Sequence, residues 1–124
     1  FSLGVNIFFE LNKKLAELVK DESYKQKIHE IHHTQKLDAP SGTAISLAEQ
    51  INKATKTKTQ ITSERRNNEI GIHQVTYTSE LDQIEIKHTA KNRDGFAIGA
   101  IIAAEWILGK QGIYNMQDVL FKKK

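Results

Sequence analysis

The segment that organises this chain spans residues 30–44 and reads EIHHTQKLDAPSGTA. It begins in a strand predicted over residues 24–33, which ends in two adjacent histidines. Asp38 and Pro40 both interrupt regular structure, so a turn is expected there. A helix is predicted from about residue 41 to residue 53, with Pro40 in its first turn, because the N–H that proline lacks would be unpaired at that position. The segment therefore leads directly from a strand into a helix.

The start of this helix has the properties of an anion-binding site. The backbone N–H groups of Ser41, Gly42 and Thr43 have no partner within the helix, and the helix dipole places partial positive charge at the same end. Gly42 has no Cβ, so a ligand can approach its backbone closely. Lys36 adds a full positive charge from the preceding loop. We therefore expect this end of the helix to bind a carboxylate or a phosphate.

Two histidines, His32 and His33, add acid–base capacity near neutral pH. Adjacent residues of a strand point to opposite faces, so only one of them would face a pocket unless the strand ends there. A lone histidine is more often a structural residue, and residues 38–42 alone could be an ordinary turn and helix cap. The combination of these features within one short segment favours a functional site.

A metal site is the main alternative for the histidines, because His29, His32 and His33 form the pattern H-x-x-H-H. His29 and His33 would share one face of the strand, but four residues of strand span about 13 Å, which is too far for one ion. His32 would point the other way. We therefore predict no metal site.

Helical and strand patterns follow one another along the rest of the chain. Apolar residues recur at helical spacing over residues 2–20, and residues 94–108 are apolar around most of the circumference of a helix. Strands are predicted over residues 59–64, 71–79 and 83–89, and the last two are expected to pair as an antiparallel hairpin. This order predicts an α+β fold with a four-stranded mixed or antiparallel sheet and helices packed on one side.

The predicted hairpin also bears on assembly. Val75 and Tyr77 alternate onto one side of its first strand, and Ile84 and Ile86 onto one side of its second. The chain has too few helices to cover both faces of the sheet. We therefore expect apolar side chains on an uncovered face to find partners in a homotetramer.

Composition excludes several classes of protein. The 124 residues suit one domain, and the net charge of +3 is too small to decide the partner. The absence of cysteine excludes disulfides and thiolate metal sites, which fits a cytoplasmic protein. No apolar run reaches the roughly 18 residues of a membrane span, and no leader peptide is recognised. Basic residues are not interleaved with aromatic ones, so nucleic acid is not an expected partner; a basic pocket for an acidic small molecule remains open.

The segment over residues 30–44 resembles the signature of the 4-hydroxy-tetrahydrodipicolinate reductases, also called dihydrodipicolinate reductases, of diaminopimelate and lysine biosynthesis. The likeness extends to FSLGVN at residues 1–6, to EIKHTA at residues 85–90 and to FAxGA at residues 96–100. It covers nearly the whole chain and is weakest over residues 53–74.

This resemblance implies a two-domain enzyme, with a Rossmann domain for NADH or NADPH and a C-terminal domain for the substrate. The chain contains no G-x-G-x-x-G fingerprint, so we expect it to be the C-terminal domain with the Rossmann domain absent. Residues 1–95 would form the substrate-binding and tetramerisation domain. Residues 96–124 would form a closing helix and tail that return to the absent nucleotide-binding domain, which would explain why this helix is apolar on more than one face.

The resemblance also implies a role for individual residues. His32 is expected to act as proton donor or acceptor, and Lys36 is expected to donate a proton. Phe1 would end a loop that contacts the cofactor. Contacts to the substrate are implied for His33, Ser41, Gly42 and Thr43.

The implied reaction is the NAD(P)H-dependent reduction of (2S,4S)-4-hydroxy-2,3,4,5-tetrahydrodipicolinate, a cyclic dicarboxylate. The 4-hydroxyl leaves first, and a hydride then reduces the unsaturated cyclic imine to give tetrahydrodipicolinate. The chain by itself is expected to be inactive. The alternative is a stand-alone module that binds carboxylates or serves assembly without redox activity, and the presence of a Rossmann domain in the parent protein would distinguish the two.

Overall fold

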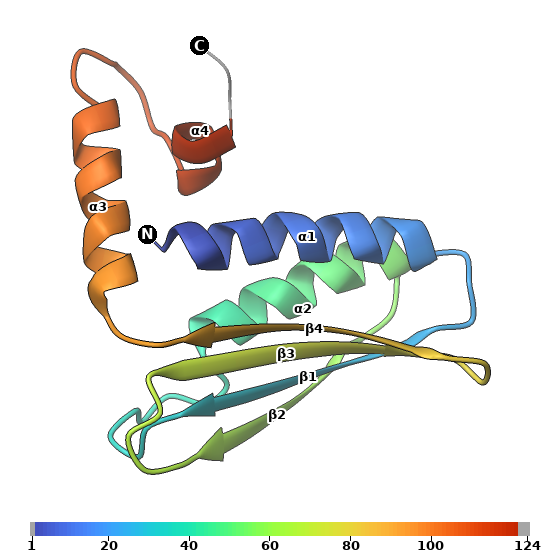
Figure 1. Ribbon diagram of the computed structural model, residues 1–124. Helices are drawn as coiled ribbons and strands as arrows, with labels where there is room; N and C mark the ends of the chain where they lie inside the picture. Colours follow the sequence, from blue (N-terminus) through green and yellow to red (C-terminus); the bar gives the residue numbers. More distant parts are fainter. Residues whose placement is uncertain (1, 122–124) are drawn as a thin grey trace.

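The computed structural model describes residues 2–121, which form a two-layer body and a projecting pair of C-terminal helices (Figure 1). The elements are α1 (Leu3–Val19), β1 (Lys25–His32), α2 (Gly42–Thr55), β2 (Gln60–Arg65), β3 (Gly71–Thr78), β4 (Gln83–Ala90), α3 (Asp94–Trp106) and α4 (Met116–Phe121). The strands form one sheet in the order β2-β1-β3-β4. β1 pairs in parallel with β2, whereas the β1–β3 and β3–β4 pairs are antiparallel. The predicted α+β fold with a mixed four-stranded sheet is thereby confirmed.

The core lies between the sheet and helices α1 and α2, which cover the same face of the sheet (Figure 1). In α2 the buried apolar residues lie at positions i, i+3, i+4 and i+7, as an amphipathic helix requires. None of the helices within residues 2–121 is long and apolar enough to cross a lipid bilayer. The buried side chains of the core are Phe8, Ala16, Val19, Ile28, Ala44, Leu47, Ala48, Ile51, Val75 and Tyr77.

The sheet face turned away from α1 and α2 is mostly polar. Val75 and Tyr77 are buried in the core, and Ile84 and Ile86 pack against it. The expectation that these four side chains form an uncovered apolar face is therefore wrong, because α1 and α2 cover the face that they share. The opposite face carries charged and polar side chains, among them Lys25, Lys27, Gln74, Thr76, Glu85 and Lys87.

Helix α2 begins after Ser41, which is its N-cap. The backbone of Ser41 is extended, and its Oγ accepts a hydrogen bond from the N–H of Ala44 at 3.2 Å. Pro40 therefore precedes the cap, and the expectation that it lies in the first turn is wrong. A serine at this position satisfies one of the free N–H groups of the helix start. The first helical residues are consequently Gly42 and Thr43.

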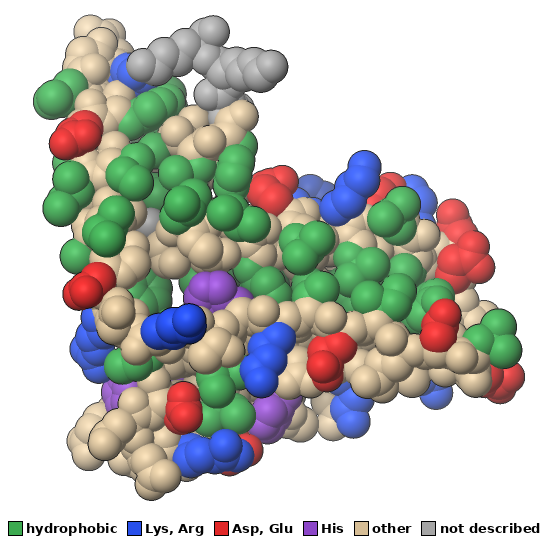
Figure 2. Space-filling model, viewed as in Figure 1, with side chains coloured by type: hydrophobic (Ala, Val, Ile, Leu, Met, Phe, Trp, Pro, Cys, Tyr) green, Lys and Arg blue, Asp and Glu red, His purple; other side chains and the backbone are tan. Residues whose placement is uncertain are grey.

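Helices α3 and α4 project from the two-layer body (Figure 1). Gly99 is the one buried residue of α3, and its apolar side chains are largely exposed. Figure 2 shows hydrophobic side chains gathered along this helix and on the neighbouring part of the molecule. Apolar side chains thus surround most of the circumference of α3, as predicted. Within residues 2–121, no other element covers them. Exposed apolar residues of this part include Phe96, Ile98, Ile101, Ile107 and Leu108.

A buried polar contact joins the two layers. Asn12, in α1, donates from Nδ2 to the carbonyl oxygen of Leu47 at 3.2 Å and to Oε1 of Gln50 at 3.0 Å. The hydroxyl of Tyr77, in β3, donates to Oδ1 of Asn12 at 2.8 Å. Asn12 and Tyr77 are both fully buried. This amide therefore links α1, α2 and the sheet through hydrogen bonds between the layers.

Removal of the Tyr77 hydroxyl is expected to destabilise the fold. In Tyr77→Phe, Oδ1 of Asn12 loses its buried donor, which should lower the free energy of unfolding by about 1–3 kcal/mol. Urea unfolding followed by circular dichroism measures this change. Tyr24→Phe is the matched control, because Tyr24 donates to Asp82 at 2.7 Å in an exposed position, and its loss should cost less than about 0.5 kcal/mol. Equal losses in the two variants would contradict the prediction.

Candidate functional site

The predicted site residues meet at one edge of the sheet. β1, β2 and β4 end at this edge and β3 begins there. The edge carries a pocket of about 370 Å³, within the roughly 300–1,000 Å³ that small-molecule sites occupy. Phe1, the residue assigned to the cofactor, lies outside the described residues. The pocket is lined by His32, His33, Lys36, Ser41, Gly42, Thr43, Ile70, Arg93 and Phe96.

Both histidines reach the pocket because the strand ends between them. β1 ends at His32, and His33 already belongs to the loop. The alternation that would send neighbouring side chains to opposite faces therefore no longer applies at His33. His32 is buried, whereas His33 is partly exposed.

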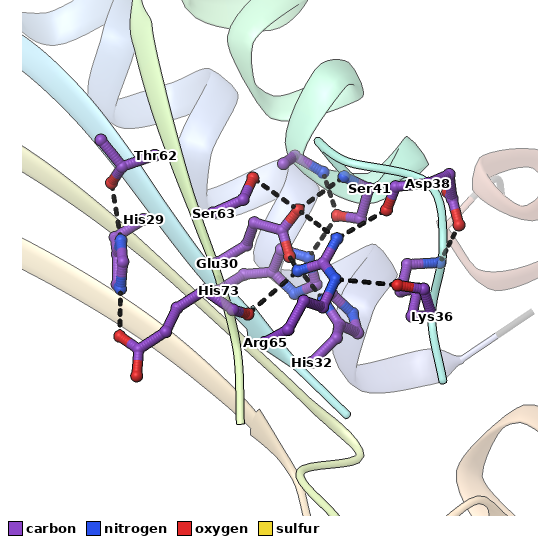
Figure 3. A network of polar contacts seen from close by, with 12 residues as sticks. His29, Glu30, His32, Lys36, Asp38, Ser41, Thr62, Ser63, Arg65 and His73 are labelled. Atoms are coloured by element: carbon purple, nitrogen blue, oxygen red, sulfur yellow. Dashed lines mark hydrogen bonds and ion pairs between the residues drawn. The ribbon is translucent and has the colours of Figure 1, made fainter. Parts of the chain in front are cut away.

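Glu30 is fully buried beside this pocket and accepts hydrogen bonds from several segments (Figure 3). Its Oε1 accepts from Nδ1 of His32 at 2.6 Å and from Nη1 of Arg65 at 2.7 Å. Its Oε2 accepts from the N–H of Ser41 at 2.6 Å and from Oγ of Ser63 at 3.1 Å. Burial raises the pKa of this carboxyl, but the hydrogen bonds outweigh burial and lower the pKa of Glu30 to about 2. Glu30 is therefore ionised at neutral pH.

His73 supports the start of α2 from the neighbouring strand β3. Its Nε2 lies 2.9 Å from Oγ of Ser41, and its ring meets the ring of His32 edge to face, with 5.0 Å between centroids. Burial, aided by the nearby His32, lowers the pKa of His73 to about 4, so the ring is neutral. A neutral ring can accept the hydroxyl hydrogen of Ser41, while the same Oγ accepts from the N–H of Ala44.

Arg65 holds the loop that carries Lys36. It donates from Nε to the carbonyl oxygen of Lys36 at 3.1 Å and from Nη2 to that of Asp38 at 2.5 Å. The Nζ of Lys36 lies 3.1 Å from the carboxylate of Asp38, and this hydrogen bond lowers the pKa of Asp38. Because Asp38 is largely exposed, the ion pair is weak. A carboxylate ligand can therefore compete with Asp38 for the lysine.

Two glycines leave space at the site in different ways. A Cβ placed on Gly42 would meet no atom within 4 Å, so the backbone at the start of α2 is open to a ligand. A Cβ placed on Gly71 would lie 3.1 Å from Nε2 of His32 and 3.3 Å from its Cδ2. Gly71 therefore allows the ring of His32 to lie close against the first residue of β3.

His29 takes no part in this pocket. Its Nδ1 lies 2.6 Å from Oγ1 of Thr62, and its Nε2 lies 3.3 Å from Oε1 of Glu64, apart from the network around Glu30 (Figure 3). Within residues 2–121, no group of three or more histidine, aspartate or glutamate side chains is arranged to hold a metal ion.

Arg65, Arg93 and Phe96 are among the residues of the site that were not assigned to it from the sequence. Arg65 directly follows the strand predicted over residues 59–64, but it is the last residue of β2. Arg93 and Phe96 follow β4 and line the pocket. Strand direction could have indicated them, because two strands that are both antiparallel to the same neighbour end at the same edge. Arg93 forms no ion pair with any described residue, so its charge is available to a ligand.

A larger hollow of about 760 Å³ lies at the opposite edge of the sheet. Its lining includes Glu22, Lys25 and Glu80, and it contains no histidine or arginine. Two carboxylates against one lysine do not favour an anion. The pocket beside His32 therefore remains the candidate site.

Comparisons with known proteins agree on one family. A family model described as dihydrodipicolinate reductase, C-terminus, matches residues 4–120. The 4-hydroxy-tetrahydrodipicolinate reductase of Christiangramia forsetii is 52% identical to this chain, over 97% of the chain and 56% of the relative. The reductase of the same name from Methanopyrus kandleri is 40% identical, over 99% of the chain and 51% of the relative.

A solved structure has the same fold. It is the dipicolinate-bound dihydrodipicolinate reductase from Paenisporosarcina sp. TG-14, which superimposes with a TM-score of 0.72 at 25% identity. The match covers 96% of this chain and 53% of that protein. The chain thus spans about half the length of the relatives that it matches.

The buried carboxylate predicts how stability depends on pH. The pKa of Glu30 is about 2 in the folded chain against an ordinary value of 4.5. Ionised Glu30 therefore stabilises the fold above about pH 4.5, and this contribution, roughly 3 kcal/mol, is lost as the pH falls toward 2. The difference in unfolding free energy between the unmodified chain and Glu30→Gln should narrow by that amount over this range.

Urea unfolding at pH 7, 5, 3 and 2 measures this difference. A loss of stability between pH 6.5 and pH 4 is expected in both proteins, because His73 stays neutral in the fold and takes up a proton on unfolding. Glu80→Gln removes an exposed carboxyl and should follow the unmodified chain. If the difference in unfolding free energy between Glu30→Gln and the unmodified chain does not change with pH, Glu30 is not the group responsible.

Proposed function

The chain belongs to the dihydrodipicolinate reductase family, whose C-terminal part it matches, and we propose that it forms the substrate-binding half of a 4-hydroxy-tetrahydrodipicolinate reductase. The substrate is then 4-hydroxy-tetrahydrodipicolinate, and the reaction belongs to diaminopimelate and lysine biosynthesis in the cytoplasm. The observation that carries this proposal is the pocket itself. Open amides at the start of α2, the charges of Lys36 and Arg93, and the buried His32 converge on one small volume.

The pocket suits a cyclic dicarboxylate. One carboxylate is bound by the N–H groups of Gly42 and Thr43, which the helix dipole makes electropositive. Lys36 supplies a full charge beside it, and Arg93 supplies a second charge for the other carboxylate. His33 completes the contacts to the substrate. Ser41 lines the same pocket, but its N–H is donated to Glu30 and its Oγ is bonded to Ala44 and His73, so its part in substrate binding is to hold the start of α2 in place.

Proton transfer falls to His32 and Lys36. His32 lines the pocket and is held from behind by Glu30, so its ring can give or take a proton without moving. Lys36 carries a proton that can assist loss of the 4-hydroxyl. Both groups act in a pocket whose water is displaced by the substrate.

The chain does not fit a dinucleotide by itself. It contains no G-x-G-x-x-G fingerprint, and the pocket of about 370 Å³ suits a single small ring. NADH or NADPH supplies the hydride in this reaction and is held mainly by the other half of the complete reductase. Within this chain, the assignment of a cofactor contact to Phe1 remains a proposal.

Two parts of the chain are proposed to have different roles. Residues 1–95 carry the assembly surface and the residues that line the substrate pocket apart from Phe96. Residues 96–124 are assigned to the closing helix and tail, although α3 already begins at Asp94, and the exposed apolar side chains of α3 pack against the nucleotide-binding half.

Binding of a dicarboxylate is expected to survive in the isolated chain. Titration calorimetry with pyridine-2,6-dicarboxylate should give weak binding, and Lys36→Ala should weaken it by about 1–3 kcal/mol, the strength of a charge-assisted hydrogen bond. Gly42→Ala should weaken binding without loss of stability, because its methyl group meets no protein atom within 4 Å but occupies the path to the backbone.

Two further variants complete this experiment. His29→Ala is the control, because His29 lies on the open face of the sheet. This variant should bind pyridine-2,6-dicarboxylate as the unmodified chain does. His32→Ala should alter binding least among the pocket variants, since its role is proton transfer. Loss of binding in His32→Ala together with normal binding in Lys36→Ala would overturn these roles.

The isolated chain is expected to show no reductase turnover. Without a nucleotide site, a nicotinamide cannot be held against the substrate. The oxidation of NADH or NADPH with freshly generated substrate measures this. Cofactor-dependent turnover by the 124-residue chain would contradict the proposal that the other half of the reductase binds the nucleotide. Dicarboxylate binding by a native protein of only 14.1 kDa would instead favour the stand-alone binding module.

The reductase is proposed to be a homotetramer built through the open face of the sheet. α1 and α2 leave that face uncovered, and its alternating charges, such as Lys27 and Glu85, can pair with a second copy. Sedimentation equilibrium should therefore give a tetramer, and the double variant Lys25→Glu/Lys27→Glu should dissociate more readily. A monomer at micromolar concentration would refute this assembly.

A further inference from the structure

The proton on the ring of His32 can be located from its partner. Glu30 is ionised, so it can only accept hydrogen bonds, and its Oε1 lies 2.6 Å from Nδ1 of His32. Nδ1 must therefore carry the hydrogen. In the neutral ring, the lone pair then lies on Nε2.

Nε2 is the nitrogen that remains available to a ligand. None of the residues within 2–121 forms a hydrogen bond with it, and it lies where a Cβ on Gly71 would come within 3.1 Å. His32 lines the pocket. The ring thus turns its protonated nitrogen to the buried carboxylate and leaves its basic nitrogen free.

The carboxylate of Glu30 also helps to position the loop that carries Lys36, through Arg65. Arg65 donates from Nη1 to Oε1 of Glu30 at 2.7 Å, and its Nε and Nη2 donate to the carbonyl oxygens of Lys36 and Asp38. A planar guanidinium fixed at one side by a buried anion holds the loop in one arrangement. Both groups that are assigned proton transfer thus depend on one side chain behind them.

We propose that Glu30 is a positioning residue, which holds His32 as its Nδ1–H tautomer with Nε2 free for the pocket and, through Arg65, fixes the loop of Lys36. This inference deepens the proposed function, on which it rests for the use of Nε2 in proton transfer. The tautomer itself does not depend on any ligand.

Substitution of Glu30 by glutamine, together with Arg65→Gln, should reverse the tautomer. The glutamine at position 30 has one oxygen, and two donors to the present carboxylate cannot change: the N–H of Ser41 beside Oε2 and Nη1 of Arg65 beside Oε1. With Arg65 replaced, only the N–H of Ser41 fixes the orientation, so the oxygen is expected to face Ser41. The amide NH₂ then faces Nδ1 of His32 and donates to it. His32 can accept that bond only by moving its own hydrogen to Nε2.

Nitrogen-15 NMR of the histidine rings measures this directly. In the unmodified 124-residue chain above neutral pH, Nδ1 of His32 should have a pyrrole-type shift and Nε2 a pyridine-type shift, with the signals assigned by their loss in His32→Gln. In Glu30→Gln/Arg65→Gln the two shifts should interchange. Ser63→Ala is the matched control, because it removes a donor to the same carboxylate without touching His32, and it should keep the original pattern.

Two results would overturn the proposal: an Nε2–H tautomer in the unmodified chain, or an Nδ1–H tautomer that persists in a folded Glu30→Gln/Arg65→Gln. The double variant leaves no unpaired buried guanidinium, and if it does not fold, the tautomer of the unmodified chain decides the proposal. Failure of the unmodified chain to bind pyridine-2,6-dicarboxylate would refute the proposed function but would not affect the tautomer result. The two failures are therefore distinguishable.

Discussion

The buried carboxylate of Glu30 is the interaction on which the site depends. An ionised carboxylate in a core is tolerated only when its oxygens are fully hydrogen-bonded. Here the donors come from the end of β1, from β2 and from the start of α2, which are His32, Ser63, Arg65 and the amide of Ser41. The need to satisfy one anion therefore fixes the positions of three segments, and these segments form the wall of the pocket.

The sheet topology determines which residues can share that wall. Because β1 is parallel to β2, Ser63 lies opposite Glu30 and Arg65 lies opposite His32. Because β3 is antiparallel to both β1 and β4, the latter two end at the same edge, and the residues after β4 reach the pocket. Arg93, far from the signature segment in sequence, arrives beside it for this reason.

The sequence predicted what depends on local pattern, and it failed where a partner had to be known. Alternation placed Val75 and Tyr77 on one side of their strand, but only the docking of α1 and α2 decides that this side is covered. The sequence predicts the start of α2 but places Pro40 inside the helix, whereas the side chain of Ser41 caps the helix and leaves Pro40 before it. Arg65 lies just beyond the predicted strand, since its ion-pair partner Glu30 lies 35 positions away in β1 and no local pattern indicates that contact.

The amide of Asn12 also helps to fix the register of strand β3. Side chains alternate along β3, so a slip of one residue would turn Tyr77 to the solvent face and bring Thr76 or Thr78 beneath α1. Neither threonine has the reach of a tyrosine ring, and the buried oxygen of Asn12 would then lack its donor at a cost of about 1–3 kcal/mol. This single polar atom thus discriminates against misaligned hairpins and selects the register that also brings His73 beside Ser41.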